Sequence, residues 1–279
     1  FISMADEIYM PDLSIVDLRG LLFEVRFFKN LMDTLGIVAE VEQISPYKTA
    51  SDQFIRSTMS DEMRENYSML FGDIYGQFVK GISDGRGWTL ERTKEIINNG
   101  PYNTRQAVDG ELITSSIYPD EYQSYIKKID GKDIDFINIS NYYKTDEYVY
   151  DWAPKESTIA VIYAVGGIQL GESVKQGDES TVMGNETISK AIKKAREDDN
   201  IDAIVLRIDS GGGSALASDL MWKEVWNSTV NDTDKIKPLI ASMSSIAASG
   251  GYYIACQADT ILAHPSTITG SIGVIGGRI

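Results

Sequence analysis

The chain has 279 residues, and 43% of them are apolar, which suffices for one large or two ordinary globular domains with real cores. Acidic residues outnumber basic ones by 41 to 26, and the formal net charge of -15 disfavours nucleic acid and anionic lipid surfaces as partners. The single cysteine, Cys256, cannot form an internal disulfide, so cysteine usage assigns no redox compartment.

The first half of the chain is predicted to be mainly helical, because its apolar residues recur at spacings of three and four. The predicted elements are a helix over 21–35, a strand over 37–41, one or two helices over 60–80 with Ser60 as N-cap, and a helix over 90–98. Residues 130–154 are rich in Asp, Tyr and Lys and lack a clear period. We therefore expect a connecting segment there, with a domain boundary near Asp151.

Strands and helices alternate in the second half. The predicted elements are a strand over 158–165, a helix over 187–199, a strand over 203–208, a helix over 214–227, a strand over 238–243 and a helix over 252–258. This order indicates an α/β unit with a largely parallel sheet. Such sheets carry their chemistry in the turns at the carboxyl ends of the strands.

Three further features concern membrane spans, the start of the chain and an internal repeat. The longest apolar runs, such as 159–165, are far shorter than the ~20 residues that span a bilayer, so we expect no membrane span within these residues. The chain opens without an initiator methionine or a signal pattern, and we expect it to be an excised piece that leaves an upstream anchor open. Residues 5–11 recur with one insertion as 258–265, which predicts parts of two similar units, each with a strand and a proline turn.

A glycine-rich turn, Asp-Ser-Gly-Gly-Gly-Ser over 209–214, follows one predicted strand and opens a helix. Its exposed backbone amides suit an anion, either a phosphate or the oxyanion of acyl transfer. The turn lacks the Gly-Lys-Ser/Thr of a phosphate-binding loop, and Leu216 breaks the dinucleotide-binding spacing. A merely flexible turn is the alternative interpretation.

A second turn, over 244–252, places Ser249 between small residues. Ala248 and Gly250 leave room for a substrate carbonyl, and the serine oxygen would lie near the positive end of a helix dipole. The alternative is a structural N-cap serine. A serine nucleophile needs a base, but the only histidine, His264, lies in a turn that the repeat explains structurally. A lysine with a lowered pKa can replace histidine, and the residue pattern does not choose among the lysines.

Four ordered stretches resemble the signal peptide peptidase A family, also called protease IV: 203–214, 243–252, 265–273, and 47–56 with Met59 and Ser60 after it. The resemblance covers nearly the whole chain. It implies a membrane-anchored serine peptidase of α/β class, built from tandem crotonase-like/Clp-protease-like domains. Residues 1–150 would be the C-terminal part of the first domain plus a linker, and residues 151–279 the second domain, truncated at its C-terminus.

The resemblance also assigns roles to residues. It implies that Ser249 is the nucleophile, that Lys48 is its general base, and that Ser271 orients the lysine. The amides of Gly213 and Gly250 would form the oxyanion hole. In that family no metal or cofactor is required, the substrates are cleaved signal peptides and other unfolded apolar peptides cut after small or apolar residues, and nucleic acid is no partner.

Family membership further implies a homotetramer whose sites are shared between subunits. It implies an anchor outside these residues, in a bacterial-type cytoplasmic membrane, with the catalytic part extracytoplasmic. The glycine turn departs from the family pattern, because Asp209 and Gly211 stand where Asn and Pro are common. Two alternatives therefore stay open: a crotonase-type acyl-CoA enzyme, which uses the same glycine-built oxyanion hole, and a non-catalytic scaffold of a membrane protein-quality complex.

Overall fold

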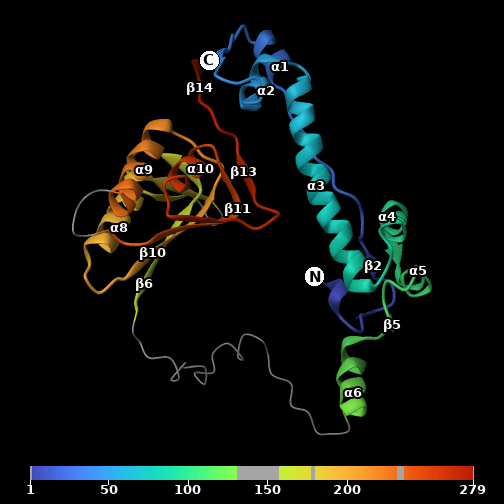
Figure 1. Cartoon of the computed structure of the whole chain (residues 1–279). Helices are drawn as coiled ribbons and strands as arrows, with labels where there is room; N and C mark the ends of the chain where they lie inside the picture. Colours follow the sequence, from blue (N-terminus) through green and yellow to red (C-terminus); the bar gives the residue numbers. More distant parts are fainter. Residues whose placement is uncertain (1, 131–156, 177–179, 231–235, 279) are drawn as a thin grey trace. The chain divides into compact units, whose positions relative to one another are not determined.

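The computed structural model describes residues 2–130, 157–176, 180–230 and 236–278 (Figure 1). Its contacts divide the chain into two compact units. One comprises Phe1–Glu24 and Phe71–Ala153, and the other comprises Val25–Leu70 and Pro154–Ile279. Residues 25–70 therefore pack with the C-terminal half of the chain. The predicted assignment of 1–150 and 151–279 to two successive crotonase-like domains remains a prediction.

A parallel sheet forms the centre of the second unit. Its strands are β6 (Ile159–Val165), β10 (Ala203–Ser210), β11 (Leu239–Ala248), β12 (Thr260–Leu262) and β13 (Ile268–Gly270). The strand order is β12-β11-β10-β6, β13 also pairs with β11, and every one of these pairings is parallel. Helices α8 (Asn185–Glu197), α9 (Ala215–Thr229) and α10 (Gly250–Ala255) pack against this sheet (Figure 1). The predicted α/β alternation is confirmed.

The core of this unit lies between the sheet and its helices. Alternate residues of β10, namely Ile204, Leu206 and Ile208, are fully buried, as expected where one face of a strand is covered. On α8, Ile188, Ile192 and Ala195 follow the helical period and are also buried. A small sheet adds β7 (Gly167–Gln169), β8 (Val174–Gln176) and β9 (Ser180–Gly184), which the sequence did not predict.

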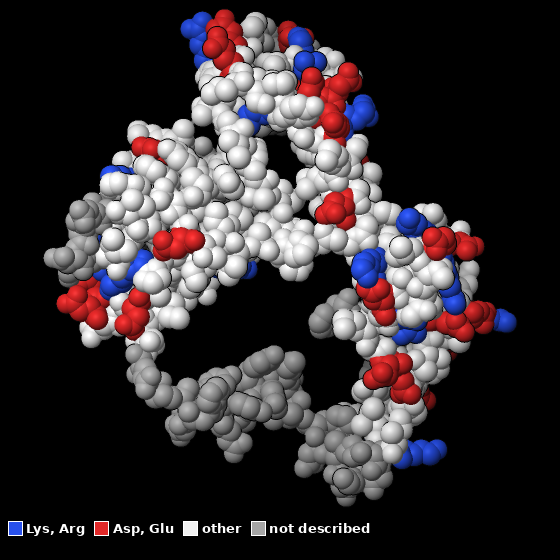
Figure 2. Space-filling model, viewed as in Figure 1, with Lys and Arg blue, Asp and Glu red and all other residues white. Residues whose placement is uncertain are grey.

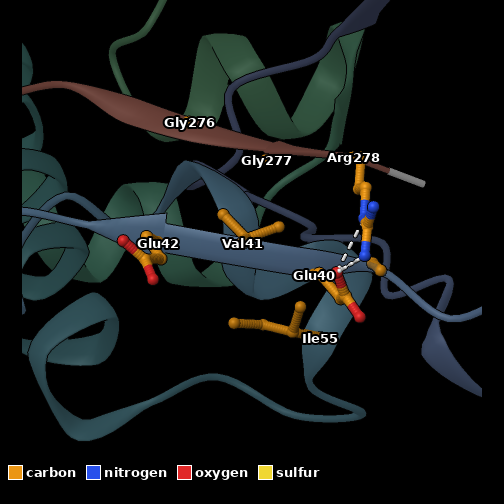
Figure 3. Close-up of a pocket in the computed structure, with 8 residues that line it drawn as sticks. Glu40, Val41, Glu42, Ile55, Gly276, Gly277 and Arg278 are labelled. Carbon is orange, nitrogen blue, oxygen red and sulfur yellow. Dashed lines mark hydrogen bonds and ion pairs between the residues drawn. The ribbon is translucent and has the colours of Figure 1, made fainter.

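The remainder of the second unit consists of short elements: α1 (Lys29–Thr34), β3 (Glu40–Gln43), the 3-10 turn η2 (Thr49–Ser51), α2 (Asp52–Ile55), the first turns of α3 (Asp61–Arg86), and β14 (Ile275–Arg278). Strands β3 and β14 form an antiparallel ribbon (Figure 3). The ribbon and Ile55 line a pocket of about 760 Å³ in which Arg278 pairs with Glu40 at 2.7 Å. The described residues that line this pocket include no serine, threonine, cysteine or lysine.

Two predictions for this segment are wrong. The helix expected over 21–35 is only α1, because Leu21 and Leu22, at 50% and 84% exposure, are not buried against a core. The backbone N–H of Phe28 instead donates to the carbonyl of Gln53. The strand expected over 37–41 lies at Glu40–Gln43, because those residues pair with β14.

The first unit is mainly helical. Its elements are η1 (Ile2–Met4), β1 (Tyr9–Met10), β2 (Ile15–Val16), the rest of α3, α4 (Leu90–Asn99), β4 (Tyr102–Asn103), α5 (Thr104–Asp109), β5 (Ser115–Ser116) and α6 (Pro119–Asp130). The predicted helix over 90–98 is confirmed as α4, and the helix over 60–80 is confirmed as the longer α3. Helices α5 and α6 were not predicted. The expected linker lies largely outside the described residues.

The sequence repeat corresponds to a repeated succession of elements. Strands β1 and β2 flank a turn at Pro11, and β12 and β13 flank a turn at Pro265. The surroundings differ, because β12 and β13 both pair with β11, whereas β1 pairs with β5 and β2 with β4. It is the second copy that lies beside Ser249, the residue that follows β11.

Candidate active site

Ser249 occupies the junction between β11, which ends at Ala248, and α10, which begins at Gly250. The predicted turn over 244–252 is mostly strand, because residues 246–248 pair with β13. Ser249 has φ 53° and ψ -117°, a conformation that a non-glycine residue adopts only when its surroundings enforce it. It stands at the N-cap of α10 but makes no capping hydrogen bond with its side chain. Ser249 therefore has the N-cap position that the alternative interpretation expected, but its hydroxyl does not cap the helix and contacts Lys48 instead.

The partner of the Ser249 hydroxyl is the amine of Lys48. The Nζ atom lies 3.0 Å from Ser249 Oγ and 2.9 Å from Ser271 Oγ, and it also contacts the backbone carbonyl oxygen of Ser271. Lys48 is 6% exposed, and its burial lowers the pKa of the amine because a desolvated ammonium ion is disfavoured. All three residues belong to the same unit of a single chain.

The three contacts of the Lys48 amine match the hydrogen-bonding capacity of both of its protonation states. An ammonium group donates three N–H bonds. A neutral amine donates two and keeps a lone pair, so the two oxygens of Ser271 can take its protons while the lone pair faces Ser249 Oγ. The arrangement can therefore hold a neutral lysine ready to accept a proton from the serine.

The register of two parallel strands brings Ser271 beside Ser249. Ala248 pairs with Gly270, so the residue after each strand end is also adjacent to its counterpart. The N–H of Ser249 donates to the Gly270 carbonyl at 2.8 Å. Ser271 also has a positive φ, 49°, and this conformation leaves its hydroxyl and carbonyl oxygens both in contact with the lysine.

The glycine-rich turn is held by a short strand that the sequence did not predict. Ile168 of β7 donates its N–H to the Gly212 carbonyl at 3.0 Å, and its carbonyl accepts from the N–H of Ser214 at 2.9 Å. In such a parallel bridge the residue between the two bonded ones, Gly213, directs its own N–H and carbonyl to the opposite side. Gly213 has φ 155°, and a Cβ there would lie 2.2 Å from the Ile168 carbonyl oxygen.

Gly250 supplies a second backbone amide by a different route. It is the first residue of α10, and the N–H groups of a helix's first turn have no partner within the helix. A Cβ at Gly250 would lie 2.4 Å from Ser218 Oγ, so any side chain there would require Ser218 of helix α9 to shift. The amides of Gly213 and Gly250 thus belong to the two chain segments that flank Ser249.

All five residues that the resemblance singled out line one cavity of about 710 Å³. Its lining includes Lys48, Ser249, Ser271, Gly213 and Gly250. The apolar part of the wall comes from Tyr252, Tyr253, Ile272, Val274 and Ile275. The cavity therefore combines a serine, a buried amine and two glycine amides with apolar walls, the combination that acyl transfer on an apolar peptide requires.

The glycine turn is held in place although Asp209 and Gly211 differ from the family pattern. Asp209 accepts a hydrogen bond from the Ile246 N–H through its carboxylate, at 3.2 Å, and another through its carbonyl from the Gly166 N–H, at 3.0 Å. At Gly211 a Cβ would meet only Ile246 Cδ1, at 3.6 Å, so the turn itself has space for a larger residue. The absence of proline there is not imposed by crowding.

The other candidates do not contribute to the cavity. His264 lies in the turn at Pro265, where its Nδ1 accepts from the Ser266 N–H, and it does not line the cavity. Within the described ranges, no group of three or more His, Cys, Asp or Glu side chains is placed to hold a metal ion. None of the helices described is long and apolar enough to cross a bilayer.

Figure 2 shows acidic and basic side chains interspersed on the face in view.

Sequence reasoning missed the residues that hold this site in place. Ile168 braces the glycine turn, but its strand of three residues is too short to produce a periodic signal. Tyr47, Asp52 and Ser60 make hydrogen bonds that hold the lysine turn. Of these three, the sequence analysis named only Ser60 for a structural role, as a helix N-cap. That prediction is confirmed, because Ser60 Oγ accepts from the Met63 N–H at 3.2 Å.

Comparisons with known proteins agree with this geometry. Residues 2–131 and 231–279 match the family model of Peptidase family S49. The chain is 35% identical over 277 residues to "Serine protease SPPA, chloroplastic" of Arabidopsis thaliana, covering 98% of this chain and 40% of the relative. It is 32% identical over 289 residues to "Protease 4" of Haemophilus influenzae, covering 98% of this chain and 45% of the relative. The chain thus spans less than half the length of these relatives.

A solved structure, that of a ClpP1 mutant from Listeria monocytogenes, overlaps 36% of this chain and 46% of its own, with 19% identity and a TM-score of 0.24. An overlap of this size is too small to define the fold. The resemblance to the signal peptide peptidase A family is confirmed by the family match and the two long relatives.

Proposed function

Because the chain belongs to Peptidase family S49, we propose that the cavity is the active site of a serine endopeptidase with Ser249 as nucleophile and Lys48 as general base. One observation carries the proposal: the buried Lys48 amine lies 3.0 Å from the Ser249 hydroxyl oxygen. Nucleophile and base within hydrogen-bond reach, with the base fixed by a third group, are what nucleophilic catalysis requires. Ser271 is that third group.

The first half of the reaction forms an acyl-enzyme. Neutral Lys48 accepts the Ser249 hydroxyl proton while Oγ attacks the carbonyl carbon of the scissile peptide bond. The N–H groups of Gly213 and Gly250 donate to the resulting oxyanion, which is worth ~10²–10³ in rate for each such donor. Protonated Lys48 then gives its proton to the leaving nitrogen, the C–N bond breaks, and an ester to Ser249 remains.

The second half releases the acyl group. Lys48, neutral again, accepts a proton from water as the water oxygen attacks the ester carbon. The tetrahedral intermediate collapses, the bond to Oγ breaks, and Lys48 returns the proton to Ser249. The products are a carboxylic acid, an amine and the free enzyme, so atoms and charges balance without a cofactor.

We extend the proposal to the substrates and the assembly. The apolar walls of the cavity suit unfolded apolar peptides, and cleaved signal peptides are the substrates that fit the name of a further relative, "Putative signal peptide peptidase SppA" of Enterococcus faecium. A homotetramer and an anchor in the cytoplasmic membrane, outside these residues and with the catalytic part extracytoplasmic, belong to the same proposal. In the structure one chain supplies both Lys48 and Ser249, and the sharing of sites between subunits stays a prediction.

The test compares Ser249→Ala, Lys48→Ala and the double variant in the full natural chain, with an apolar peptide substrate and a fluorophosphonate probe. Groups that act as one unit should each abolish turnover, and the double variant should lose no more than either alone. The probe should label the wild type and should not label Ser249→Ala. Full turnover in either single variant would overturn the dyad.

The same experiment separates the two alternatives. A crotonase-type acyl-CoA enzyme would not be labelled at Ser249, and it would turn over a thioester in Ser249→Ala as well as in the wild type. A scaffold would assemble normally but would neither hydrolyse peptide nor react with the probe. Labelling of Ser249 that requires Lys48 contradicts both.

A further inference from the structure

The turn that carries Lys48 is fastened to its surroundings on three sides. Tyr47 donates its hydroxyl to Glu65 of α3 at 2.8 Å, and Ser51 donates to the Gln43 side chain of β3 at 2.8 Å. The third attachment is Asp52, which follows Lys48 by four residues across η2 and α2. Ser51 is also buried, at 4% exposure, but Asp52 differs from the other two because its buried group is a carboxylate.

Asp52 is 2% exposed, and its Oδ2 atom accepts a hydrogen bond of 2.5 Å from the hydroxyl of Ser60, which is 6% exposed. Arg56, on the exposed side of the same turn, lies 3.7 Å from that oxygen. Burying a carboxylate is unfavourable unless hydrogen bonds and an opposite charge compensate. Because burying the Asp52 carboxylate costs free energy, its position calls for a functional or structural reason, whereas an exposed carboxylate would not.

Ser60 connects the carboxylate to helix α3. A hydroxyl has one proton to donate and lone pairs to accept with. Ser60 uses the proton on Asp52 and accepts from the N–H of Met63, which makes it the N-cap of α3. One hydroxyl therefore ties the turn of Lys48 to the first turn of a 26-residue helix.

We propose that the buried Asp52–Ser60 pair is the positioning device for Lys48, which sets where the lysine amine stands against Ser249. The inference rests on the proposed dyad and goes beyond it, because neither residue touches the reacting atoms. The short helical turn from Thr49 to Ile55 is a stiff link, so a displaced Asp52 displaces Lys48. A misplacement of ~1 Å at a reacting group can reduce a rate about 100-fold.

The critical variant is Ser60→Ala, measured in the full natural chain. It removes the hydroxyl that fixes Asp52, and kcat should fall by about 10- to 100-fold with little change in KM, because neither Asp52 nor Ser60 lines the cavity. The pH-rate limb that belongs to Lys48 should also move to higher pH, since an amine that leaves its buried position regains water. Burial is the cause of the lowered pKa in the native position.

The charged and titratable groups around the Lys48 turn come from three neighbouring segments. Asp52, Arg56 and Tyr47 lie on the turn itself, and Glu42 lies on β3 next to Gln43. On the first turns of α3, Glu62 and Glu65 interact with Tyr47, and Tyr67 interacts with Asp52. Ser60→Ala alters none of these charges. A moved limb therefore reports a moved lysine.

Ser83→Ala is the matched control. Ser83 lies near the other end of α3, is also 6% exposed, and donates its hydroxyl to the Trp88 carbonyl at 2.6 Å. Its loss should lower stability in a similar way without shifting the pH-rate limb. Ser60→Thr retains a hydroxyl that can cap the helix and donate to Asp52, and it should restore most of kcat.

The outcomes separate this inference from the proposed function. If fluorophosphonate fails to label wild-type Ser249, the proposed function fails. If the wild type is labelled but Ser60→Ala keeps its kcat and its pH-rate limb, the positioning role is wrong. If Ser60→Ala fails to fold, two variants of its partner decide instead. Asp52→Asn keeps an oxygen that accepts from Ser60 and should keep kcat, whereas Asp52→Ala removes the acceptor and should lower kcat and move the limb; equal kcat in the two variants overturns the positioning role.

Discussion

The amine of Lys48 lies 3.0 Å from the hydroxyl oxygen of Ser249, although 201 positions separate the two residues in the chain. The lysine reaches the serine because β3, which precedes it, pairs with β14, which follows Ser271. Two segments from opposite ends of the sequence are thereby held at one cavity. The geometry around this pair makes the effects of pH and of single substitutions predictable.

The activity should depend on pH through Lys48. The base is active when neutral, and burial lowers its pKa, so kcat/KM for an apolar peptide should rise with pH through a limb centred below the ~10.4 of free lysine. Between the pKa of Lys48 in the folded chain and the higher pKa of Lys48 in the unfolded chain, the folded state binds fewer protons than the unfolded state. The contribution of Lys48 to the free energy of unfolding therefore rises with pH in that window. A limb centred at or above the free-lysine value would contradict a desolvated base.

Ser271→Ala should impair the enzyme without abolishing its activity. The substitution removes one of the two oxygens that hold the Lys48 amine, while the backbone carbonyl remains. The loss of one hydrogen bond to a charged group, about 1.5–3 kcal/mol, corresponds to about a 10- to 100-fold reduction in kcat. Steady-state kinetics beside Lys48→Ala measure the difference, and an equal loss in both variants would show that Ser271 is part of the reacting unit.

Gly213→Ala should inactivate the enzyme. Its Cβ would lie 2.2 Å from the Ile168 carbonyl oxygen, so the turn must move and the oxyanion donor with it, at a cost of ~10²–10³ in kcat. The comparison variant is Gly211→Ala, where the Cβ meets only a side-chain atom at 3.6 Å. Thermal unfolding should show Gly213→Ala destabilised and Gly211→Ala more stable by about 0.4–1 kcal/mol. The reverse order would refute this account of the turn.

Ser249→Gly should be more stable than Ser249→Ala. Both variants lose the nucleophile, but glycine adopts a positive φ of 53° without the Cβ penalty, which is of order 1 kcal/mol. Urea denaturation of the two inactive variants compares their free energies of unfolding, and so measures the cost of a positive φ at position 249. Equal midpoints would mean that the strain at Ser249 is no larger than the ~0.4–1 kcal/mol that glycine costs through the entropy of the unfolded chain.

The elements that sequence patterns predicted well are those whose apolar residues meet a core. The runs that became β6, β10 and α4 alternate or repeat with a clear period, and they were placed within a residue or two. The helix expected over 21–35 failed because periodicity measures amphipathicity and cannot tell whether a partner surface exists. Residues 244–248 were assigned to a turn because their small and polar side chains lack a strand pattern. They are in fact the last residues of β11, and 246–248 pair with β13.

In the candidate site, too, some residues could be predicted from local pattern and others could not. Small residues around Ser249 and the glycines at 211–213 were visible in the sequence, because close backbone approach demands the absence of side chains. The resemblance added Lys48 and Ser271. Neither periodicity nor spacing could have chosen this lysine, since a pKa shift depends on burial, and burial is a property of the folded chain.

Local residue size and pattern were enough to predict the glycine turn, the small residues around Ser249 and the α/β alternation that carries both. The folded chain alone reveals which amine faces Ser249, which carbonyl and hydroxyl contact that amine, and which buried pair lies on its turn. Those relationships arise from strand register and from contacts between residues far apart in the chain, and no local pattern encodes them.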